Sequence, residues 1–502
     1  MLNEFIKCIE KFPKRNAFCI NGNYYNYHGF AKIISGIKDA IDILPDQSIK
    51  TIGVTSFDDI ETYASFYSAL FAGKTFVPID SSSPIDRNSL MINLAEIKVI
   101  LTSRMNDEVL KMIKEFPEIK FIETKGIQSS EINLTAPKIK PEDSAYILFT
   151  SGSTGVPKAV PLSHKNVNSF IDAFLALGYN IDENDRCLQS SDLLFDLSTM
   201  SYMVPLLKGA CVYTVPEEGI RYANILEILT EREITFALMV PSVLNYLRPF
   251  FKDIMLEKMR YSLFCGEALY GDIISEWTEC VPNALIQNVY GPTEATNFCL
   301  TYDWNKNKSS NKIFNGVICI GKPMKNTEAI IIDENYNQLP VGEKGELCLA
   351  GLQLTSGYLK NPEKNDSAFF KICKDGLETT FYKTGDISFK DSEDDFFYCG
   401  RKDYQIKIHG YRIELGEIEY HARQFISPAN AAAVAYQNEA GLTKIHLFAE
   451  QLNCKIENLY EYLKTKIPPY MLPSKITLLE KLPLNSNGKV DRKLLLNFVK
   501  NK

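Results

Sequence analysis

The sequence ILFTSGSTGVPK, residues 147–158, joins an apolar run to a loop rich in hydroxyl groups and glycine that ends on a lysine. Residues 145–149 predict a buried strand. Glycines in such a loop let several backbone N–H groups point at one oxyanion, and the hydroxyls and the lysine add donors and positive charge. The hydroxyl donors are Thr150, Ser151, Ser153 and Thr154, and the charge is Lys158. We therefore expect a polyphosphate site, although most loops of this composition are surface turns.

The same loop does not match the common nucleotide-binding pattern G-x-x-x-x-G-K-[ST]. Pro157 precedes the lysine and Ala159 follows it, so the spacing from Gly152 fails. The loop thus predicts ATP binding but argues against a P-loop NTPase.

Composition narrows the class of protein. A length of 502 residues, 45% of them hydrophobic, predicts two or more domains. A net charge of -7 without a basic tract argues against nucleic acid as a partner. No apolar stretch approaches the length of a membrane span, and the first residues have neither a basic nor an apolar region, so we expect no secretory signal. The 12 cysteines form no C-x-x-C pair, so we expect a reduced, cytoplasmic protein without a zinc site or disulfides.

The order of predicted elements indicates an α/β protein. Strands and helices alternate from about residue 51 onward, which favours a parallel sheet covered by helices. Beyond about residue 312, short strands between turn residues predict a small antiparallel, β-barrel-like subdomain. A charged junction at Lys402 and Asp403 precedes helices and strands of a small α+β unit. We expect an N-terminal domain over 1–402 and a mobile C-terminal domain over 403–502.

A second polar motif, NVYGPTE at residues 288–294, follows a predicted strand. Tyr290 offers a flat face for a purine, and Asn288 offers an amide to an exocyclic amine. Glu294 is a hard oxygen ligand suited to Mg²⁺ between phosphates. Taken alone, the motif also fits a Gly-Pro turn with a solvated glutamate.

Four further parts of the sequence suit a functional role, but each also fits an ordinary structural role. Asp386, after a Thr-Gly turn, suits a ribose clamp but also an ordinary turn. The alternating residues 405–415 suit an edge hairpin, and Lys489 lies in a loop where a lysine is usually solvated. Asp196 lies among apolar neighbours, where it would pair with a substrate ammonium or cap a helix.

The order of these motifs resembles that of the adenylate-forming superfamily, which includes acyl-CoA synthetases, luciferases and the adenylation domains of nonribosomal peptide synthetases. The resemblance covers nearly the whole chain. Within the superfamily, residues 195–200, 264–267 and 405–412 most resemble D-alanine:D-alanyl carrier protein ligases and neighbouring amino-acid-adenylating enzymes.

This resemblance implies roles for individual residues. ATP would contact Thr150, Ser151, Gly152, Thr154, Lys158, Asn288, Val289, Tyr290, Gly291, Pro292, Thr293, Asp386, Tyr398, Arg401 and Lys489. The amino-acid pocket would comprise Asp196, Leu197, Met200, Leu238, Leu263, Cys265, Val289, Asn297, Phe298 and Lys489. The catalytic groups would be Lys489, Glu294 as the Mg²⁺ ligand, and Gly410 at the pantetheine tunnel. Asp403 would be the hinge.

The implied activity is formation of an aminoacyl-adenylate from ATP, followed by transfer to a carrier-protein thiol. The large side chains of this pocket leave little room, so we expect a small amino acid. Leu238, Val289, Asn297 and Phe298 differ from the D-alanine ligase pattern, so D-alanine itself is in doubt. The chain ends soon after Lys489, so we expect a separate phosphopantetheinylated carrier protein and a monomeric enzyme. Two alternatives remain open, an acyl- or aryl-CoA ligase and a non-catalytic ATP-binding protein.

Overall fold

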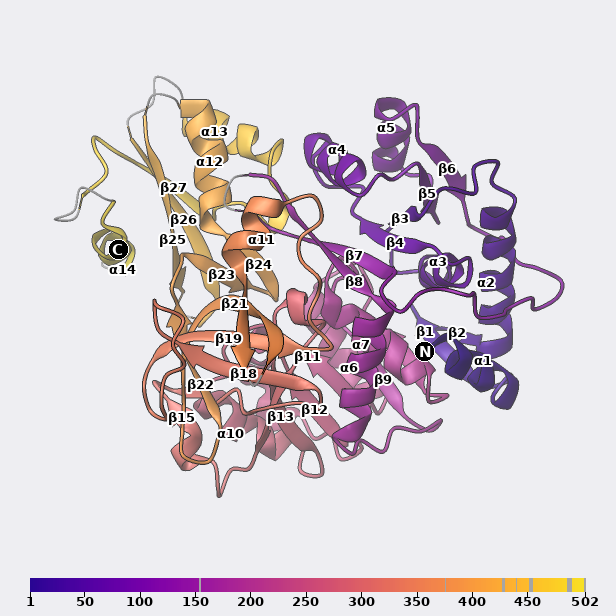
Figure 1. The fold of residues 1–502 in the computed structure, drawn as a ribbon, viewed down its shortest axis with the longest axis horizontal. Coiled ribbons are helices and arrows are strands. Elements are labelled where there is room, and N and C mark those ends of the chain that lie inside the picture. Colours follow the sequence, from indigo (N-terminus) through magenta and orange to yellow (C-terminus); the bar gives the residue numbers. More distant parts are fainter. Residues whose placement is uncertain are drawn as a thin grey trace.

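A computed structural model describes residues 1–152, 155–374, 376–426, 429–438, 440–450, 455–484 and 490–500. The chain forms α/β layers, an antiparallel sheet and a C-terminal unit, which lie side by side (Figure 1). This arrangement confirms the predicted α/β class with a smaller β subdomain.

The first sheet has six strands in the order β6-β5-β3-β4-β7-β8. Its strands are β3 (Thr51–Thr55), β4 (Thr75–Ile79), β5 (Val99–Thr102), β6 (Lys120–Glu123), β7 (Ser144–Thr150) and β8 (Lys158–Ser163). Its connecting helices are α3 (Ile60–Phe71), α4 (Ile85–Leu94) and α5 (Asp107–Glu115). Neighbouring strands are parallel except β7 and β8, which form a hairpin. The alternation of strand and helix in the sequence is therefore realised as a parallel sheet.

The second sheet has nine strands in the order β17-β14-β13-β12-β11-β9-β10-β1-β2, parallel from β1 to β13 and antiparallel at both edges. Its strands are β1 (Asn16–Ile20), β2 (Asn23–Asn26), β9 (Arg186–Gln189), β10 (Cys211–Thr214), β11 (Phe236–Met239), β12 (Tyr261–Phe264), β13 (Leu285–Tyr290), β14 (Leu300–Trp304) and β17 (Lys322–Pro323). Its helices are α1 (Leu2–Lys11), α2 (Tyr27–Asp42), α6 (His164–Ala176), α7 (Asp196–Leu206), α8 (Arg221–Glu231), α9 (Ser242–Leu247), η1 (Arg248–Asp253) and α10 (Gly271–Cys280).

The main core lies between these two sheets. Every residue of α7 is buried, and so is every residue of α3 except Glu61. A helix that is buried all round must be covered on all sides, and one continuous apolar cluster joins α3, α7 and strands of both sheets. This core holds the parallel strands in place. Open α/β sheets bind ligands at the carboxyl ends of such strands.

The antiparallel part follows residue 312, as the turn-rich sequence predicts. Its five strands are β18 (Thr327–Ile332), β19 (Gly345–Gly351), β20 (Phe369–Lys374), β21 (Leu377–Lys390) and β22 (Phe396–Arg401). Among the described residues this sheet stays open, with β22 branching from β21. Smaller elements beside it are η2 (Thr293–Ala295), η3 (Ser310–Lys312), β15 (Ile313–Phe314), β16 (Val317–Ile318) and α11 (Pro362–Ala368).

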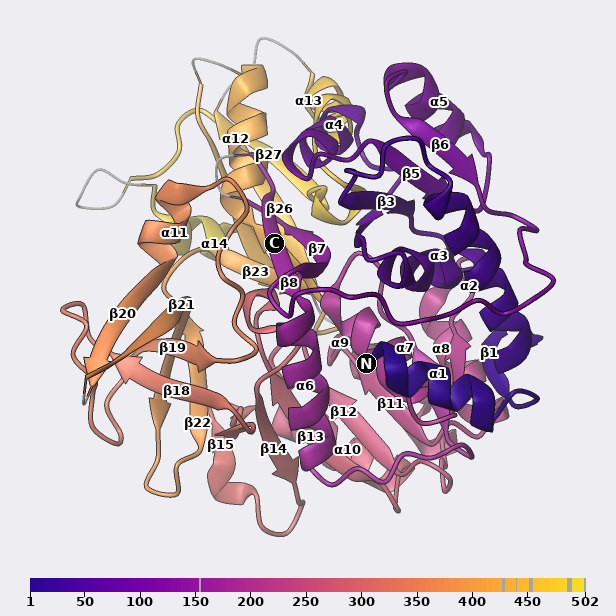
Figure 2. The same cartoon turned by 45° about the vertical axis from the view of Figure 1, so that its right-hand side comes forward.

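The C-terminal unit consists of a hairpin, a three-stranded sheet and helices. Its elements are β23 (Gln405–Ile408), β24 (Tyr411–Glu414), α12 (Leu415–Ile426), β25 (Ala431–Gln437), β26 (Thr443–Glu450), α13 (Ile456–Lys464), η4 (Pro469–Met471), β27 (Lys475–Leu479) and α14 (Arg492–Lys500). Two apolar clusters belong to this unit alone. Hairpin β7–β8 lies between the N-terminal layers and this unit in both views (Figure 1, Figure 2). The domain boundary at residues 402 and 403 stays a prediction.

Two other expectations concern composition. None of the described helices is long and apolar enough to cross a membrane. All cysteines in the described part of the chain are free, and most are buried. The predicted elements did not include α2, β8, α8, α9, α10, β27 or α14.

Candidate active site

The predicted phosphate loop is the turn of hairpin β7–β8. The strand register pairs Thr150 with Lys158, so the lysine returns beside the end of the incoming strand. Thr150 Oγ1 is buried and has no hydrogen-bond partner among the described atoms. An orphaned hydroxyl of this kind suits a phosphate oxygen. Ser153 and Thr154, which the sequence also assigns to phosphate, lie outside the described residues.

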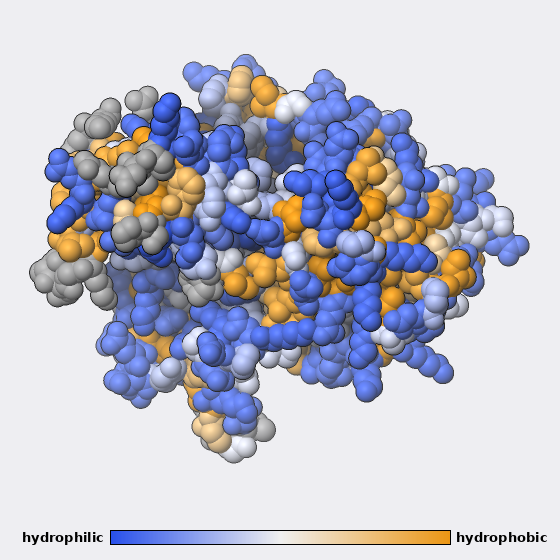
Figure 3. Space-filling view, turned by 90° about the horizontal axis from the view of Figure 1, so that it is seen from above, coloured by the Kyte–Doolittle hydropathy of each residue, from blue (hydrophilic) through white to orange (hydrophobic). Residues whose placement is uncertain are grey.

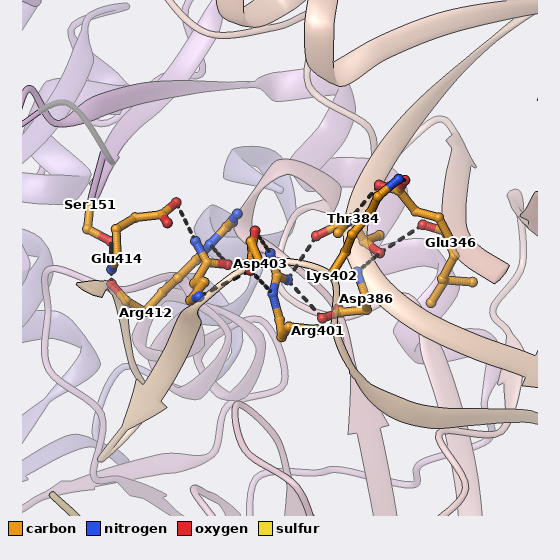
Figure 4. A network of polar contacts seen from close by, with 12 residues as sticks. Ser151, Glu346, Thr384, Asp386, Arg401, Lys402, Asp403, Arg412 and Glu414 are labelled. Carbon is orange, nitrogen blue, oxygen red and sulfur yellow. Dashed lines mark hydrogen bonds and ion pairs between the residues drawn. The ribbon is translucent and has the colours of Figure 1, made fainter. Parts of the chain in front are cut away.

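Two side chains of this loop contact β24 of the C-terminal unit. Ser151 Oγ donates to the Arg412 carbonyl at 2.8 Å and accepts from the Glu414 backbone N–H at 3.0 Å (Figure 4). Lys158 Nζ lies 3.1 Å from Glu414 Oε1. Burial lowers the pKa of Lys158, and the nearby Arg412 charge lowers it further, against the opposing carboxylates. The phosphate loop and β24 therefore form one continuous polar site.

The loop backbone also meets α12. Gly152 N–H donates to Glu417 Oε2 at 3.1 Å, and the other oxygen of Glu417 pairs with Arg87 Nη1 at 2.6 Å. Arg87 belongs to α4, and both side chains are almost completely buried. A carboxylate thus lies against a backbone amide that the sequence assigns to phosphate.

Glu294 occupies η2 and is completely buried. Arg412 Nη1 donates to its two oxygens at 3.0 and 2.8 Å, and Tyr358 Oη donates to Oε1 at 2.6 Å. Burial alone would raise the pKa of Glu294, but the charges of Arg412 and Lys158 lower it to about 2.

An ionised, buried carboxylate that already faces a guanidinium fits a cation, and carboxylate oxygen is the ligand type Mg²⁺ prefers. The described residues contain no group of three His, Cys, Asp or Glu that could hold a metal ion. Glu294 would hold a magnesium ion through its carboxylate oxygens, as the resemblance implies.

A cavity of ≈ 280 Å³ lies beside the carboxyl end of β13, between the antiparallel sheet and hairpin β23–β24. Seven of the predicted nucleotide-binding residues line it, Asn288, Val289, Tyr290, Gly291, Asp386, Tyr398 and Arg401. Asn288 Nδ2 donates to the carbonyls of Ile318 and Cys319 at 3.3 and 2.9 Å, which fixes its amide. Pro292 and Thr293 follow in the chain and lead into η2. The cavity therefore gathers most of the nucleotide motif at one place.

Asp386 is held at the wall of this cavity from two sides. Its Oδ1 accepts from Arg401 Nη1 at 2.8 Å (Figure 4). Its Oδ2 accepts from the Tyr290 hydroxyl. Arg401 Nη2 also pairs with Asp403 Oδ2 at 2.8 Å. Asp386, Tyr290 and Asp403, which are predicted to contact ribose, to contact adenine and to act as the hinge, thus share one hydrogen-bonded network.

Asp196 is the first residue of α7 and is 7% exposed. The N-cap is Phe195, so the alternative of Asp196 as a helix cap does not hold. Burial raises the pKa of Asp196 to about 6, against a hydrogen bond from Thr293 and the charge of Lys407. Asn297 Nδ2 donates to the Asp196 carbonyl at 2.9 Å, and its Oδ1 is buried without a partner among the described atoms.

The remaining predicted pocket residues are buried and belong to the main apolar cluster. The buried ones from α7 and the strand ends are Leu197, Met200, Leu238, Leu263, Cys265 and Val289. Phe298 packs edge-on against Phe170 of α6, with ring centroids 5.2 Å apart. Its ring therefore belongs to the main core, and its predicted contact with substrate stays a prediction.

The tip of hairpin β23–β24 reaches the same region. Gly410 has φ +82°, and a Cβ there would lie 2.7 Å from Val240 Cγ1. Its N–H donates to Glu267 Oε1 at 3.2 Å. Only glycine fits this close approach, which places the predicted tunnel residue beside the cavity.

Lys489, the predicted catalytic lysine, lies outside the described residues. Val490, its neighbour, packs with Leu495, Ala432 and Phe448 in an apolar cluster of the C-terminal unit. None of these four residues lines the nucleotide cavity.

Comparison with known proteins decides the family. The model of the AMP-binding enzyme family matches residues 7–359. The chain belongs to this family. The resemblance drawn from the motifs is thereby confirmed.

Relatives within the family include peptide synthetases and alanine-activating ligases. The chain is 30% identical to tyrocidine synthase 1 of Brevibacillus parabrevis over 97% of its own length and 44% of that protein's length. It is also 30% identical to a D-alanine–D-alanyl carrier protein ligase of Bacillus licheniformis over 86% of each chain. The chain thus spans less than half of tyrocidine synthase 1.

Solved structures agree on the fold. The adenylation domain AlmE of Vibrio cholerae, in complex with glycyl-adenosine-5'-phosphate, has a TM-score of 0.88 at 24% identity and covers 100% of this chain and 97% of that one. The o-succinylbenzoate CoA synthetase of Bacillus subtilis has a TM-score of 0.83 at 19% identity, covering 99% of this chain and 98% of that one.

Sequence reasoning missed several side chains that complete the site. Arg87, Tyr358 and Glu417 were not singled out, because each lies outside the motifs quoted above. Arg412 and Glu414 lie within the stretch 405–415, which the family pattern drew attention to through Gly410. The sequence gives no local signal that pairs Arg87 with a residue 330 positions away.

Proposed function

We propose that this protein activates a small amino acid as an aminoacyl-adenylate with ATP and then transfers the aminoacyl group to the phosphopantetheine thiol of a carrier protein. The buried carboxylate of Asp196 carries this proposal. An amine-free acid brings no positive charge to this carboxylate, whereas a substrate ammonium would neutralise it in place.

The first step needs positioning and charge neutralisation. The substrate carboxylate attacks the α-phosphorus of ATP, and pyrophosphate leaves. The attacking group is already an anion, so no general base is required, and preorganised contacts carry the step. Asn288 and Tyr290 would hold the adenine, Asp386 and Arg401 the ribose, and Thr150, Ser151, Gly152 and Lys158 the phosphates. Glu294 would hold Mg²⁺, which neutralises phosphate charge when bound.

The second step would use hairpin β23–β24. Gly410 packs against Val240 beside the nucleotide cavity, and the resemblance to the family assigns this glycine to the tunnel for the pantetheine arm. Lys489 would act in the first step instead. Residues 403–502 would therefore rotate about Asp403 between the two steps, as mobile domains do in other enzymes.

The pocket composition favours a small side chain. Leu238, Leu263, Val289 and Met200 are large and buried, which leaves little volume beyond Asp196. The D-alanine–D-alanyl carrier protein ligase relative acts on alanine by its name, and the AlmE complex contains glycyl-adenosine-5'-phosphate. Both relatives support alanine or glycine as first candidates.

An ATP–pyrophosphate exchange panel tests the proposal. Purified protein is assayed with each D- and L-amino acid, with glycine, and with amine-free short-chain and aryl acids. We expect exchange with one or a few small amino acids, followed by mass-spectrometric loading of a phosphopantetheinylated carrier. Exchange that depends only on amine-free acids, with acyl-CoA as product, would instead support a CoA ligase.

A further inference from the structure

The phosphate loop is occupied by an acidic side chain from the C-terminal unit. Glu417 bridges Gly152 N–H at 3.1 Å and Arg87 Nη1 at 2.6 Å. Its side chain is 0% exposed and that of Arg87 is 7% exposed. Two oxygens of one oxyanion thus satisfy a backbone amide and a guanidinium together, which is also how phosphate is bound.

Other charged groups of the C-terminal unit also pair with residues that are predicted to bind ATP or Mg²⁺. Arg412 pairs with Glu294 at 2.8 Å, where a cation is expected, and Glu414 pairs with Lys158 at 3.1 Å, where a phosphate is expected. Each C-terminal group has the charge of the ligand component it replaces. Among the described residues, the Lys158 and Arg87 cations beside the phosphate loop are therefore already paired with carboxylates of the C-terminal unit.

A buried arginine cannot lose its only anionic partner without a large penalty. Arg87 has one ion pair among the described residues, with Glu417, and α12 carries that carboxylate. If the C-terminal domain rotates for adenylate formation, Glu417 withdraws with it, and the Arg87 guanidinium beside Gly152 becomes free to bind another oxyanion.

We propose that Arg87 binds the pyrophosphate moiety, in ATP or as the free product, and that Glu417 takes its position when pyrophosphate has left. This inference rests on the proposed function. It makes pyrophosphate and the present domain arrangement mutually exclusive, so product release and domain closure are coupled through one guanidinium.

A cavity of ≈ 290 Å³ on the other side of the loop supports the assignment. It lies between α4, the loop, α12 and α13, and Arg87, Gly155, His421 and Lys466 line it. From above, the surface is hollowed between the C-terminal unit and the N-terminal helices (Figure 3). The cavity gives the Arg87 side of the loop a path to solvent, while Lys466 is held by Asp86 at the cavity wall.

The test compares three variants in amino-acid-dependent ATP–pyrophosphate exchange with magnesium pyrophosphate as the probe. Arg87→Met removes the proposed ligand, Glu417→Gln removes its competitor, and Lys466→Met is the control. Lys466 lines the same cavity and pairs with Asp86 across the same boundary at 2.5 Å.

We expect Arg87→Met to raise the half-saturating concentration of pyrophosphate by roughly ten- to a hundredfold, the loss typical of one charge-assisted hydrogen bond. The half-saturating concentration of ATP for Arg87→Met shows whether Arg87 already contacts the pyrophosphate moiety within ATP. The amino-acid half-saturation and the Lys466→Met values stay within about twofold. Glu417→Gln has the opposite sign, with pyrophosphate binding unchanged or tighter and aminoacyl transfer to the thiol slower.

Equal weakening of pyrophosphate by Arg87→Met and Glu417→Gln would overturn the inference, because Arg87 would then only hold Glu417 in place. The double variant Arg87→Met/Glu417→Gln leaves no lone buried charge, and the proposal requires it to keep the weakened pyrophosphate binding. Wild-type protein without amino-acid-dependent exchange contradicts the proposed function instead. Calorimetric titration of magnesium pyrophosphate into wild type and Arg87→Met then tests Arg87 independently, and equal affinities refute it.

Discussion

Replacing Asp196 with asparagine should make the protein more stable and less active at the same time. Burial raises the pKa of Asp196 from 3.8 to about 6, so its charged form costs about 3 kcal/mol in the folded protein. The folded state binds this proton more tightly than the unfolded state. Stability from this group is therefore fully present below pH 4, falls as pH rises from about 4 to 6, and stays low above 6.

Asparagine has nearly the same shape and no charge. The free energy of unfolding of the variant should therefore exceed that of wild type by up to about 3 kcal/mol at pH 8, and the two should be equal near pH 4. Removing one partner of a buried pair typically costs roughly 3–5 kcal/mol, so kcat/KM for the amino acid should fall roughly 10²–10⁴-fold. In wild type the KM for the amino acid should rise as pH drops below 6, because only the ionised carboxylate binds an ammonium.

Denaturant unfolding and pyrophosphate exchange at several pH values measure both effects. Asp58→Asn is a matched control, because burial also raises the pKa of Asp58 to about 6 while its partners are Thr214 and Tyr63. It should share the stability change and keep kcat/KM within about threefold. An Asp196→Asn protein with unchanged kcat/KM would refute the role of this carboxylate.

Three other substitutions separate the steps. Glu294→Gln should slow exchange by roughly 10²–10³-fold and raise the Mg²⁺ requirement, and an unchanged Mg²⁺ titration would contradict the metal assignment. Lys489→Ala should abolish exchange but retain thiol transfer from a supplied aminoacyl-adenylate; full exchange would show that another group performs its role. Gly410→Ala should retain exchange but lose thiol transfer, because the new Cβ would lie 2.7 Å from Val240 Cγ1 at φ +82°. Radiolabelled carrier loading measures the transfer step, and normal loading by this variant would contradict a tunnel at Gly410.

Local sequence patterns predicted the elements that depend on local physics. An Asn-Gly pair such as residues 21 and 22 favours a tight hairpin turn, and both residues have positive φ in the turn between β1 and β2. The apolar run before Thr150 predicted β7, and the strand–helix alternation predicted parallel sheets. Each signal lies within a few residues of the structure that it specifies.

The rest of the site depends on contacts between distant segments. Ser151 meets Arg412 from 261 positions away, and Arg87 meets Glu417 from 330 positions away. No local pattern encodes such pairs, because they depend on how the C-terminal unit docks. The family pattern named Gly410 and the Glu294 motif but not the charges that pair with them in this arrangement.

The central claim is that a buried carboxylate selects an amino acid, and one pair of substrates tests it. Alanine and propionate share a carbon skeleton and differ only in the α-amino group. ATP–pyrophosphate exchange by the wild-type protein should be stimulated by an enantiomer of alanine at least a hundredfold more than by propionate in kcat/KM, roughly the value of one buried ion pair. Equal stimulation by propionate would contradict the account.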